Sequence, residues 1–243
     1  MKITINKVNI NYVQYGNSNG RDILLLHGWG QNIEMMKPIG DRFQENYRIT
    51  ILDFPGFGES DEPTFAWTLD DYSLMIEEFV ERLSINKPIV IGHSFGGRVA
   101  IMYSSNNVIE KLILLASPVR CEVSNNSLKV KMLKSLKKLP GMGNIAEYMK
   151  KYIGSRDYKA ASTIMRQVLV NTVNKDLVES AKKIEEPTIL IWGDNDLEAQ
   201  LDDAKLLEQV MPDAGLIILH GTHYAYLENL GQVVNIINNF IGG

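Results

Sequence analysis

The chain has 243 residues, a formal net charge of −4 at pH 7, and 45% hydrophobic against 22% charged residues. These values are typical of a globular protein with a large buried core, and we expect no nucleic-acid partner. Cys121 is the only cysteine, which excludes an internal disulfide and fits a reducing compartment. The N-terminus lacks the apolar core of a signal peptide, and no apolar run approaches the roughly 18 residues of a membrane span, so we expect a cytoplasmic protein.

Short apolar strands alternate with helices along most of the chain. The first part predicts strands at 2–9, 10–16 and 22–26, a helix at about 35–45, a strand at 47–52, a helix capped by Thr68 and ending near 83, a strand at 87–91, a helix from 97, and a strand at 110–115. The last part predicts a strand at 187–192, a helix at about 198–210, a strand at 216–219 and a helix from about 227. Such alternation indicates a mostly parallel α/β sheet covered on both faces, with ligands bound beyond the carboxyl ends of the strands.

A Gly-x-Ser-x-Gly motif centred on Ser94 is the most informative feature of the chain. The motif follows the apolar run 87–91, which favours a buried strand, and precedes residues 97–103, which favour a helix. A serine at such a sharp strand-to-helix turn has a strained backbone and an exposed hydroxyl. Gly92 and Gly96 relieve the crowding between strand and helix. The motif therefore predicts a nucleophile elbow with Ser94 as the nucleophile.

Four histidines could act as the general base for this serine. His93 lies inside the elbow, where its side chain should point away from the serine hydroxyl, and His27 lies in a loop after an early strand. His220 ends the last strand, which favours a structural role. His223 lies in the following loop, where an imidazole placed over the elbow accepts the serine proton; the alternative is a solvated loop histidine. We expect His223 to be the base.

An acid that orients this imidazole is expected after the strand at 187–192, where Asp194 and Asp196 both follow Gly193. The chain order serine, acid, histidine is that of α/β-hydrolases and differs from the order in chymotrypsin-like and subtilisin-like enzymes. On these motifs the chain resembles the α/β-hydrolase family over nearly its whole length. The resemblance implies a mostly parallel sheet of roughly eight strands with helices on both faces. It also selects Asp196 as the acid and leaves Asp194 as a turn residue.

The same resemblance implies an oxyanion hole made by two backbone N–H groups. One belongs to Phe95, directly after the nucleophile, and the other to Trp29 in the loop after an early strand. Gly28 and Gly30 flank Trp29 and let the backbone approach the substrate. The Trp29 indole either lines the acyl pocket or packs on the end of the sheet. We expect Gly28, Trp29 and Phe57 to lie at the substrate site.

Two other kinds of site draw on the same residues. Gly28-x-Gly30 followed by Asp53 imitates a dinucleotide-binding fingerprint, but Ile33 stands where the third glycine belongs and the elbow would be unexplained. A metal cluster could be drawn from Asp194, Asp196, His220 and His223, yet the sequence has no His-Glu-x-x-His motif and no cysteine pair. We therefore expect hydrolysis that uses no cofactor and no metal.

Residues 118–186 interrupt the alternation with helical, basic sequence, and we expect them to form a lid inserted into a core of residues 1–117 and 187–243. Between residues 118 and 170 there are 11 Lys and Arg but only 3 Asp and Glu. Two interpretations stay open: an amphipathic lid helix with a solvated lysine face, or a surface for an acidic carrier protein or an anionic membrane. The loops at 27–30 and 53–58 also resemble those of the pimeloyl carrier-protein methyl esterase subgroup.

Three functional classes follow from these residues. In the leading one, a small hydrophobic acyl ester is hydrolysed through an acyl-enzyme, with Ser94 as nucleophile, His223 as base and Asp196 steadying the imidazolium. In the second, the same residues act on a carbon–carbon bond, as in a hydrolase or lyase. In the third, the chain is a ligand receptor or signalling protein built on a hydrolase scaffold, because a fold does not fix a biological role.

Overall fold

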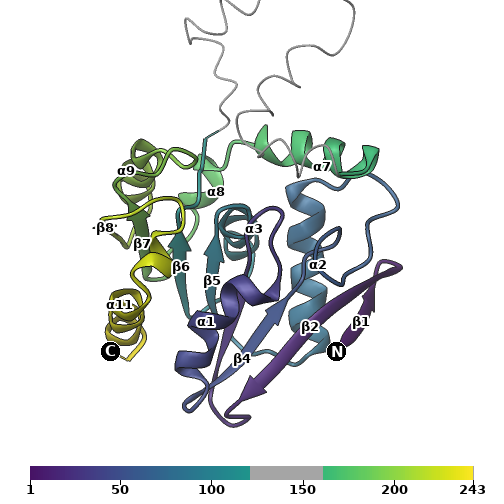
Figure 1. Cartoon of the computed structure of the whole chain (residues 1–243), viewed down its shortest axis with the longest axis horizontal. Coiled ribbons are helices and arrows are strands. Elements are labelled where there is room, and N and C mark those ends of the chain that lie inside the picture. Colours follow the sequence, from purple (N-terminus) through teal and green to yellow (C-terminus); the bar gives the residue numbers. More distant parts are fainter. Residues whose placement is uncertain (121–160, 243) are drawn as a thin grey trace, which may run out of the picture.

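The computed structural model describes residues 1–120 and 161–242. The strands are β1 (Lys2–Ile5), β2 (Val8–Gly16), β3 (Arg21–Leu26), β4 (Tyr47–Leu52), β5 (Ile89–His93), β6 (Lys111–Leu115), β7 (Thr188–Gly193) and β8 (Ala214–Leu219). The helices are α1 (Ile33–Phe43), α2 (Leu69–Arg82), α3 (Phe95–Ser104), α7 (Thr163–Val173), α8 (Val178–Ala181), α9 (Leu201–Val210), α10 (Ala225–Glu228) and α11 (Leu230–Gly242). The described strands form one eight-stranded sheet in the order β1-β2-β4-β3-β5-β6-β7-β8 (Figure 1).

The sheet is mixed only at one edge. The β1–β2 and β2–β4 pairs are antiparallel, whereas every neighbouring pair from β4 to β8 is parallel. The crossing from β4 back through β3 to β5 places the carboxyl ends of β3, β4 and β5 side by side. The mostly parallel sheet expected from the sequence is confirmed, and the loops after these strands meet at the edge where α/β proteins bind ligands.

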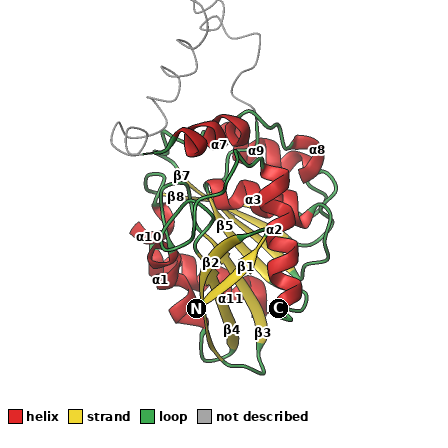
Figure 2. Cartoon of the chain, turned by 90° about the vertical axis from the view of Figure 1, so that its right-hand side faces the viewer, coloured by secondary structure: helices red, strands yellow, loops and turns green. Residues whose placement is uncertain are grey.

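Helices cover both faces of the sheet (Figure 2), which explains why the central strands β3, β5, β6 and β7 are mostly apolar and buried. Within β3, Leu24 and Leu26 join the core under α2, α3, α8 and α9, while Ile23 and Leu25 join the core under α1 and α11. All four side chains are fully buried. At the start of α2, the Thr68 hydroxyl accepts from the Asp71 amide and the Asp71 carboxylate accepts from the Thr68 amide, so the expected cap is confirmed.

Three element boundaries differ from the sequence expectations. The first hairpin turns at Asn6 and Lys7, with φ of 49° and 66°, and not between residues 9 and 10. These angles belong to a tight hairpin turn that glycine normally signals, and no glycine stands there. Helix α9 begins at Leu201 because the preceding amides bind a side chain and not the helix backbone. The final helix is interrupted at Asn229, whose side-chain amide donates to the carbonyls of His220, after β8, and Ala225, the first residue of α10.

One buried cation joins the segment after β6 to the end of α7 and the turn that follows it. Arg98, on α3, donates to the carbonyl oxygens of Pro118, Thr172 and Lys175. The side chain is 4% exposed, so these carbonyls stand in for water around its charge. Helices α7 and α8 lie within residues 118–186, the stretch expected to form a lid; its lysine-rich part lies outside the described residues, and the lid stays a prediction.

None of the helices in the described ranges 1–120 and 161–242 is long and apolar enough to cross a membrane. The expectation of a cytoplasmic location is not tested by this finding.

Candidate active site

Ser94 lies between the last residue of β5 and the first residue of α3, at the carboxyl edge of the sheet. Its backbone is in a rare conformation, with φ 51° and ψ −114°, and its amide donates to the Leu115 carbonyl at 2.9 Å. A Cβ at Gly96 would lie 2.3 Å from the Leu26 carbonyl oxygen, and one at Gly92 would lie 2.6 Å from Gly97 Cα. Both glycines are therefore required by the close approach of strand and helix. Ser94 itself remains partly exposed.

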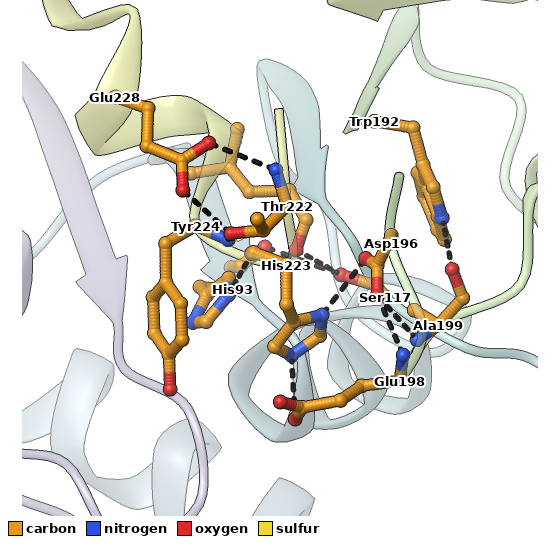
Figure 3. Close-up of polar contacts among 12 residues, drawn as sticks. His93, Ser117, Trp192, Asp196, Glu198, Ala199, Thr222, His223, Tyr224 and Glu228 are labelled. Carbon is orange, nitrogen blue, oxygen red and sulfur yellow. Dashed lines mark hydrogen bonds and ion pairs between the residues drawn. The ribbon is translucent and has the colours of Figure 1, made fainter. Parts of the chain in front are cut away.

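His223 and Asp196 form a buried pair beside this elbow. Asp196 Oδ2 lies 2.9 Å from His223 Nδ1, and the two side chains are 1% and 6% exposed. The other oxygen of Asp196 accepts from the backbone amides of Glu198 and Ala199, each at 2.8 Å. Figure 3 shows the imidazole between Asp196 on one side and Glu198 on the other. With Nδ1 bound to the carboxylate, Nε2 is the ring nitrogen left to exchange a proton.

The loop that carries His223 is held at several points. The Glu228 carboxylate accepts from the amide and hydroxyl of Thr222, at 2.8 and 2.5 Å, and these bonds lower the Glu228 pKa. The amide of Gly221 donates to Asp194 at 3.0 Å. Because both residues before His223 are fixed by carboxylates, its imidazole is placed by a rigid backbone.

His93 links the elbow to this loop. Its ring is fully buried, and its Nε2 lies 3.1 Å from the His223 carbonyl. A carbonyl can only accept, so Nε2 carries the ring proton. Burial, followed by repulsion from His223, holds the pKa of His93 well below its ordinary value. The neutral His93 ring therefore positions the backbone of His223 and leaves proton exchange to the other imidazole.

His27 is a structural histidine at the end of β3. Its Nε2 accepts from the Phe54 amide at 2.9 Å, and its Nδ1 donates to the Gly28 carbonyl at 2.7 Å. Burial lowers its pKa to about 4, so the ring is neutral at physiological pH. It joins the loop after β3 to the loop after β4.

Asp194 and His220 form a second, separate pair on the surface. Asp194 Oδ2 lies 3.0 Å from His220 Nδ1, and the His220 side chain is 88% exposed. This hydrogen bond is the main cause that lowers the pKa of Asp194 and raises that of His220. The two aspartates thus take different histidines, and Asp194 does not contact His223. Across the described residues, no three His, Cys, Asp or Glu side chains gather as metal ligands would.

Two backbone N–H groups beside Ser94 have no acceptor within the described part of the chain. One belongs to Phe95, the first residue of α3, and the other to Trp29, in the loop after β3. Side-chain contacts hold the two residues together, because the Trp29 indole meets the Phe95 ring edge-on with centroids 5.5 Å apart. The Phe95 N–H opens helix α3, where backbone donors have no partner within the helix, and the use of both groups as an oxyanion hole stays a prediction.

An apolar wall continues from this position. Trp29 is half-buried and packs against Phe57, with centroids 4.8 Å apart, and against Leu169 of α7. A Cβ on Gly56 would meet the thioether of Met165, also on α7. These contacts show that Trp29 packs on the end of the sheet, and the lining of an acyl pocket by its indole stays a prediction.

Sequence reasoning missed two side chains of the site. Glu228 was not distinguished from other helix residues, although its position six residues after Thr222 would have allowed a side chain to return to the loop. Glu198 lies two residues after Asp196, and its Oε2 is 3.6 Å from His223 Nε2. An acidic residue so soon after the expected acid was the available signal.

Comparisons with known proteins agree with this arrangement. Residues 23–145, slightly more than half of the chain, match the family described as alpha/beta hydrolase fold. The chain is 26% identical to "Lipase 3" of Moraxella sp. (strain TA144), over 96% of this chain and 81% of that protein. It is 26% identical to a monoacylglycerol lipase of Mus musculus, over 90% of this chain and 75% of that protein.

Among solved structures, an enol-lactonase from Burkholderia xenovorans LB400 superposes with a TM-score of 0.81 at 19% identity, covering 100% of both chains. At that identity the likeness concerns the fold. This structural likeness agrees with the sheet order and with the family match. The chain belongs to the alpha/beta hydrolase fold family.

Proposed function

We propose that the protein hydrolyses carboxylic esters through an acyl-enzyme, with Ser94 as nucleophile, His223 as general base and Asp196 as the acid that orients it. The observation that carries this proposal is the buried Asp196–His223 pair, with Oδ2 and Nδ1 2.9 Å apart, beside a serine in a strained strand-to-helix turn. The lipase names of two relatives support an acyl ester as substrate.

In each half of the reaction, one proton passes through His223. The Ser94 hydroxyl attacks the ester carbonyl while His223 Nε2 takes its proton, and Asp196 stabilises the imidazolium that forms. The carbonyl oxygen becomes an oxyanion, which the N–H groups of Trp29 and Phe95 bind because they have no acceptor of their own among the described residues. The alcohol leaves with the proton from Nε2. Water then repeats the sequence on the acyl-enzyme and releases the acid.

The acyl group would lie against the apolar wall beside the oxyanion site. Trp29 presents its indole there, supported by Phe57 and Leu169. A wall of aromatic and aliphatic side chains favours a hydrophobic acyl chain by burying its surface, at about 0.8 kcal/mol for each methylene. This supports a small hydrophobic acyl ester as substrate.

The test is hydrolysis of p-nitrophenyl esters of increasing acyl length by the purified protein and four variants. Ser94→Ala should lose about 10⁶-fold in kcat, and Asp196→Asn about 10⁴-fold. Asp194→Asn and His220→Gln are the matched controls and should stay within about tenfold of the wild type, because neither residue contacts the His223 imidazole.

Turnover that survives Ser94→Ala would refute the elbow as the nucleophile. A loss in Asp194→Asn as large as that in Asp196→Asn would refute the assignment of the acid. Absence of turnover by folded wild-type protein on every ester would refute the ester as substrate and direct the search to carbon–carbon bonds.

A further inference from the structure

A second carboxylate faces the imidazole from the same loop as Asp196. The loop turns sharply because Asp196 Oδ1 accepts from the amides of Glu198 and Ala199, and this brings the Glu198 side chain back towards His223. Glu198 Oε2 lies 3.6 Å from Nε2, while Asp196 Oδ2 lies 2.9 Å from Nδ1. Each ring nitrogen of His223 is therefore faced by a different carboxylate (Figure 3).

The two carboxylates differ in their surroundings. The side chain of Asp196 is 1% exposed, and both of its oxygens accept hydrogen bonds. The side chain of Glu198 is 48% exposed, and no donor within the described residues forms a hydrogen bond to it. Its separation of 3.6 Å from Nε2 is too long for a hydrogen bond. The turn is held by the backbone amide of Glu198, so its side chain has no structural task there and keeps its acceptor positions open.

The position of Glu198 places it near the alcohol half of a bound ester. In the reaction proposed above, Nε2 delivers its proton to the oxygen of the departing alcohol, so that oxygen must come within hydrogen-bond distance of Nε2. A group 3.6 Å from Nε2 is then a neighbour of the alcohol half of the substrate. In that reaction the acyl half lies against the apolar wall formed by Trp29, Phe57 and Leu169. A carboxylate can only accept hydrogen bonds, and it accepts them strongly.

We propose that Glu198 is a specificity-determining residue that accepts a hydrogen bond from a second hydroxyl of the alcohol, so that the protein prefers esters of polyols to esters of simple alkanols. This inference rests on the proposed function. When the tetrahedral intermediate collapses, the bond between the carbonyl carbon and the alcohol oxygen breaks, its electron pair goes to that oxygen, and the proton comes from Nε2. The second hydroxyl keeps its own proton and donates to Glu198 throughout.

The experiment compares two esters that share the acyl group and differ by one donor: ethylene glycol monobutyrate and methoxyethyl butyrate. Acid release is followed by titration at constant pH for wild type, Glu198→Ala, Glu198→Gln and Ser94→Ala. We expect the wild type to favour the hydroxyl ester by about tenfold to a hundredfold in kcat/KM, as for a hydrogen bond to a charged group. The ratio should fall to near one in Glu198→Ala and to an intermediate value in Glu198→Gln, whose amide oxygen still accepts.

The control variant is Glu179→Gln, which neutralises an exposed glutamate on α8 and should leave the ratio unchanged. A wild-type ratio near one, or a ratio unchanged in Glu198→Ala, would overturn the inference while leaving the esterase proposal intact. An equal loss on both esters with a shifted pH–rate profile would also overturn it, because Glu198 would then act on His223. Absence of Ser94-dependent turnover on both esters would overturn the proposed function, and this inference with it.

Discussion

The packing between α3 and the loop after β6 can be tested by adding one methyl group. A Cβ on Gly97 would lie 1.7 Å from Ser117 Oγ and 2.4 Å from Ser117 Cβ, distances at which no two such atoms can coexist. The next nearest atom is the Gly92 carbonyl oxygen at 3.1 Å, which is tight but tolerable. The obstacle to an alanine at position 97 is therefore a single side chain, and its removal should restore the fold.

The magnitudes follow from these distances. Gly97→Ala should lower the free energy of unfolding by about 3 kcal/mol or more, at the upper end of the range for overpacking. Ser117→Gly loses one hydroxyl donor, which the Gly92 and Leu115 carbonyls share at 3.3 and 3.2 Å, and should cost about 1 to 2 kcal/mol. The double variant should be no less stable than Ser117→Gly alone, so the coupling must cancel the whole cost of Gly97→Ala and amounts to about 3 kcal/mol or more.

Urea unfolding of the wild type, both single variants and the double variant measures this coupling. If Gly97→Ala yields no folded protein, rescue is scored as the appearance of folded protein in the double variant. Gly96→Ala is the matched control: its Cβ would lie 2.3 Å from a backbone oxygen of Leu26, so Ser117→Gly should not rescue it. A stable Gly97→Ala protein, or a double variant no better than Gly97→Ala, would refute the reasoning.

Three further predictions concern polar contacts. Arg98→Met should lower the free energy of unfolding by about 3 to 5 kcal/mol in urea, because three carbonyls lose a charged donor; a loss under about 1 kcal/mol would contradict this. Asp194→Asn should lower the pKa of His220 towards its ordinary value in an NMR titration, and an unchanged pKa would rule out the pair in solution. Pairing raises the pKa of His220 and lowers the pKa of Asp194. The pair therefore stabilises the fold at pH values between these two pKa values. This stabilisation is lost when the pH rises above the pKa of His220 or falls below the pKa of Asp194. Glu228→Gln should lower kcat several-fold with an unchanged circular dichroism spectrum, because Thr222 loses the carboxylate that holds the loop; an unaltered kcat would show that the loop needs no such support.

Features that depend on neighbours in the chain could be predicted from the sequence. The strand at 47–52 and the Thr68 cap are local patterns of apolar residues and hydrogen-bonding groups, and both are present. The strand-to-helix turn at Ser94 is equally local, because glycines on both sides of a serine between a strand and a helix leave few other conformations.

The direction in which a side chain points depends on the folded loop, and the sequence alone did not determine it. Asp194 and Asp196 occupy one loop, and spacing alone could not decide between them. The contacts differ because backbone amides turn the Asp196 carboxylate inwards while Asp194 stays at the surface. The direction of Glu198 follows from that same turn, which is a property of the folded loop. The hairpin at Asn6 and Lys7 was missed since non-glycine residues seldom adopt positive φ.

The bond from His93 Nε2 to the His223 carbonyl has a consequence for how the protein would lose its site. His93 is the last residue of a central strand, so the loop bearing the base is fastened to the most protected part of the sheet. Transient opening of that loop exposes a buried ring and breaks a buried bond, and its population is correspondingly small. Amide hydrogens of the loop near His223 should therefore exchange with solvent in step with those of β5, and heat inactivation should coincide with the melting of the whole sheet.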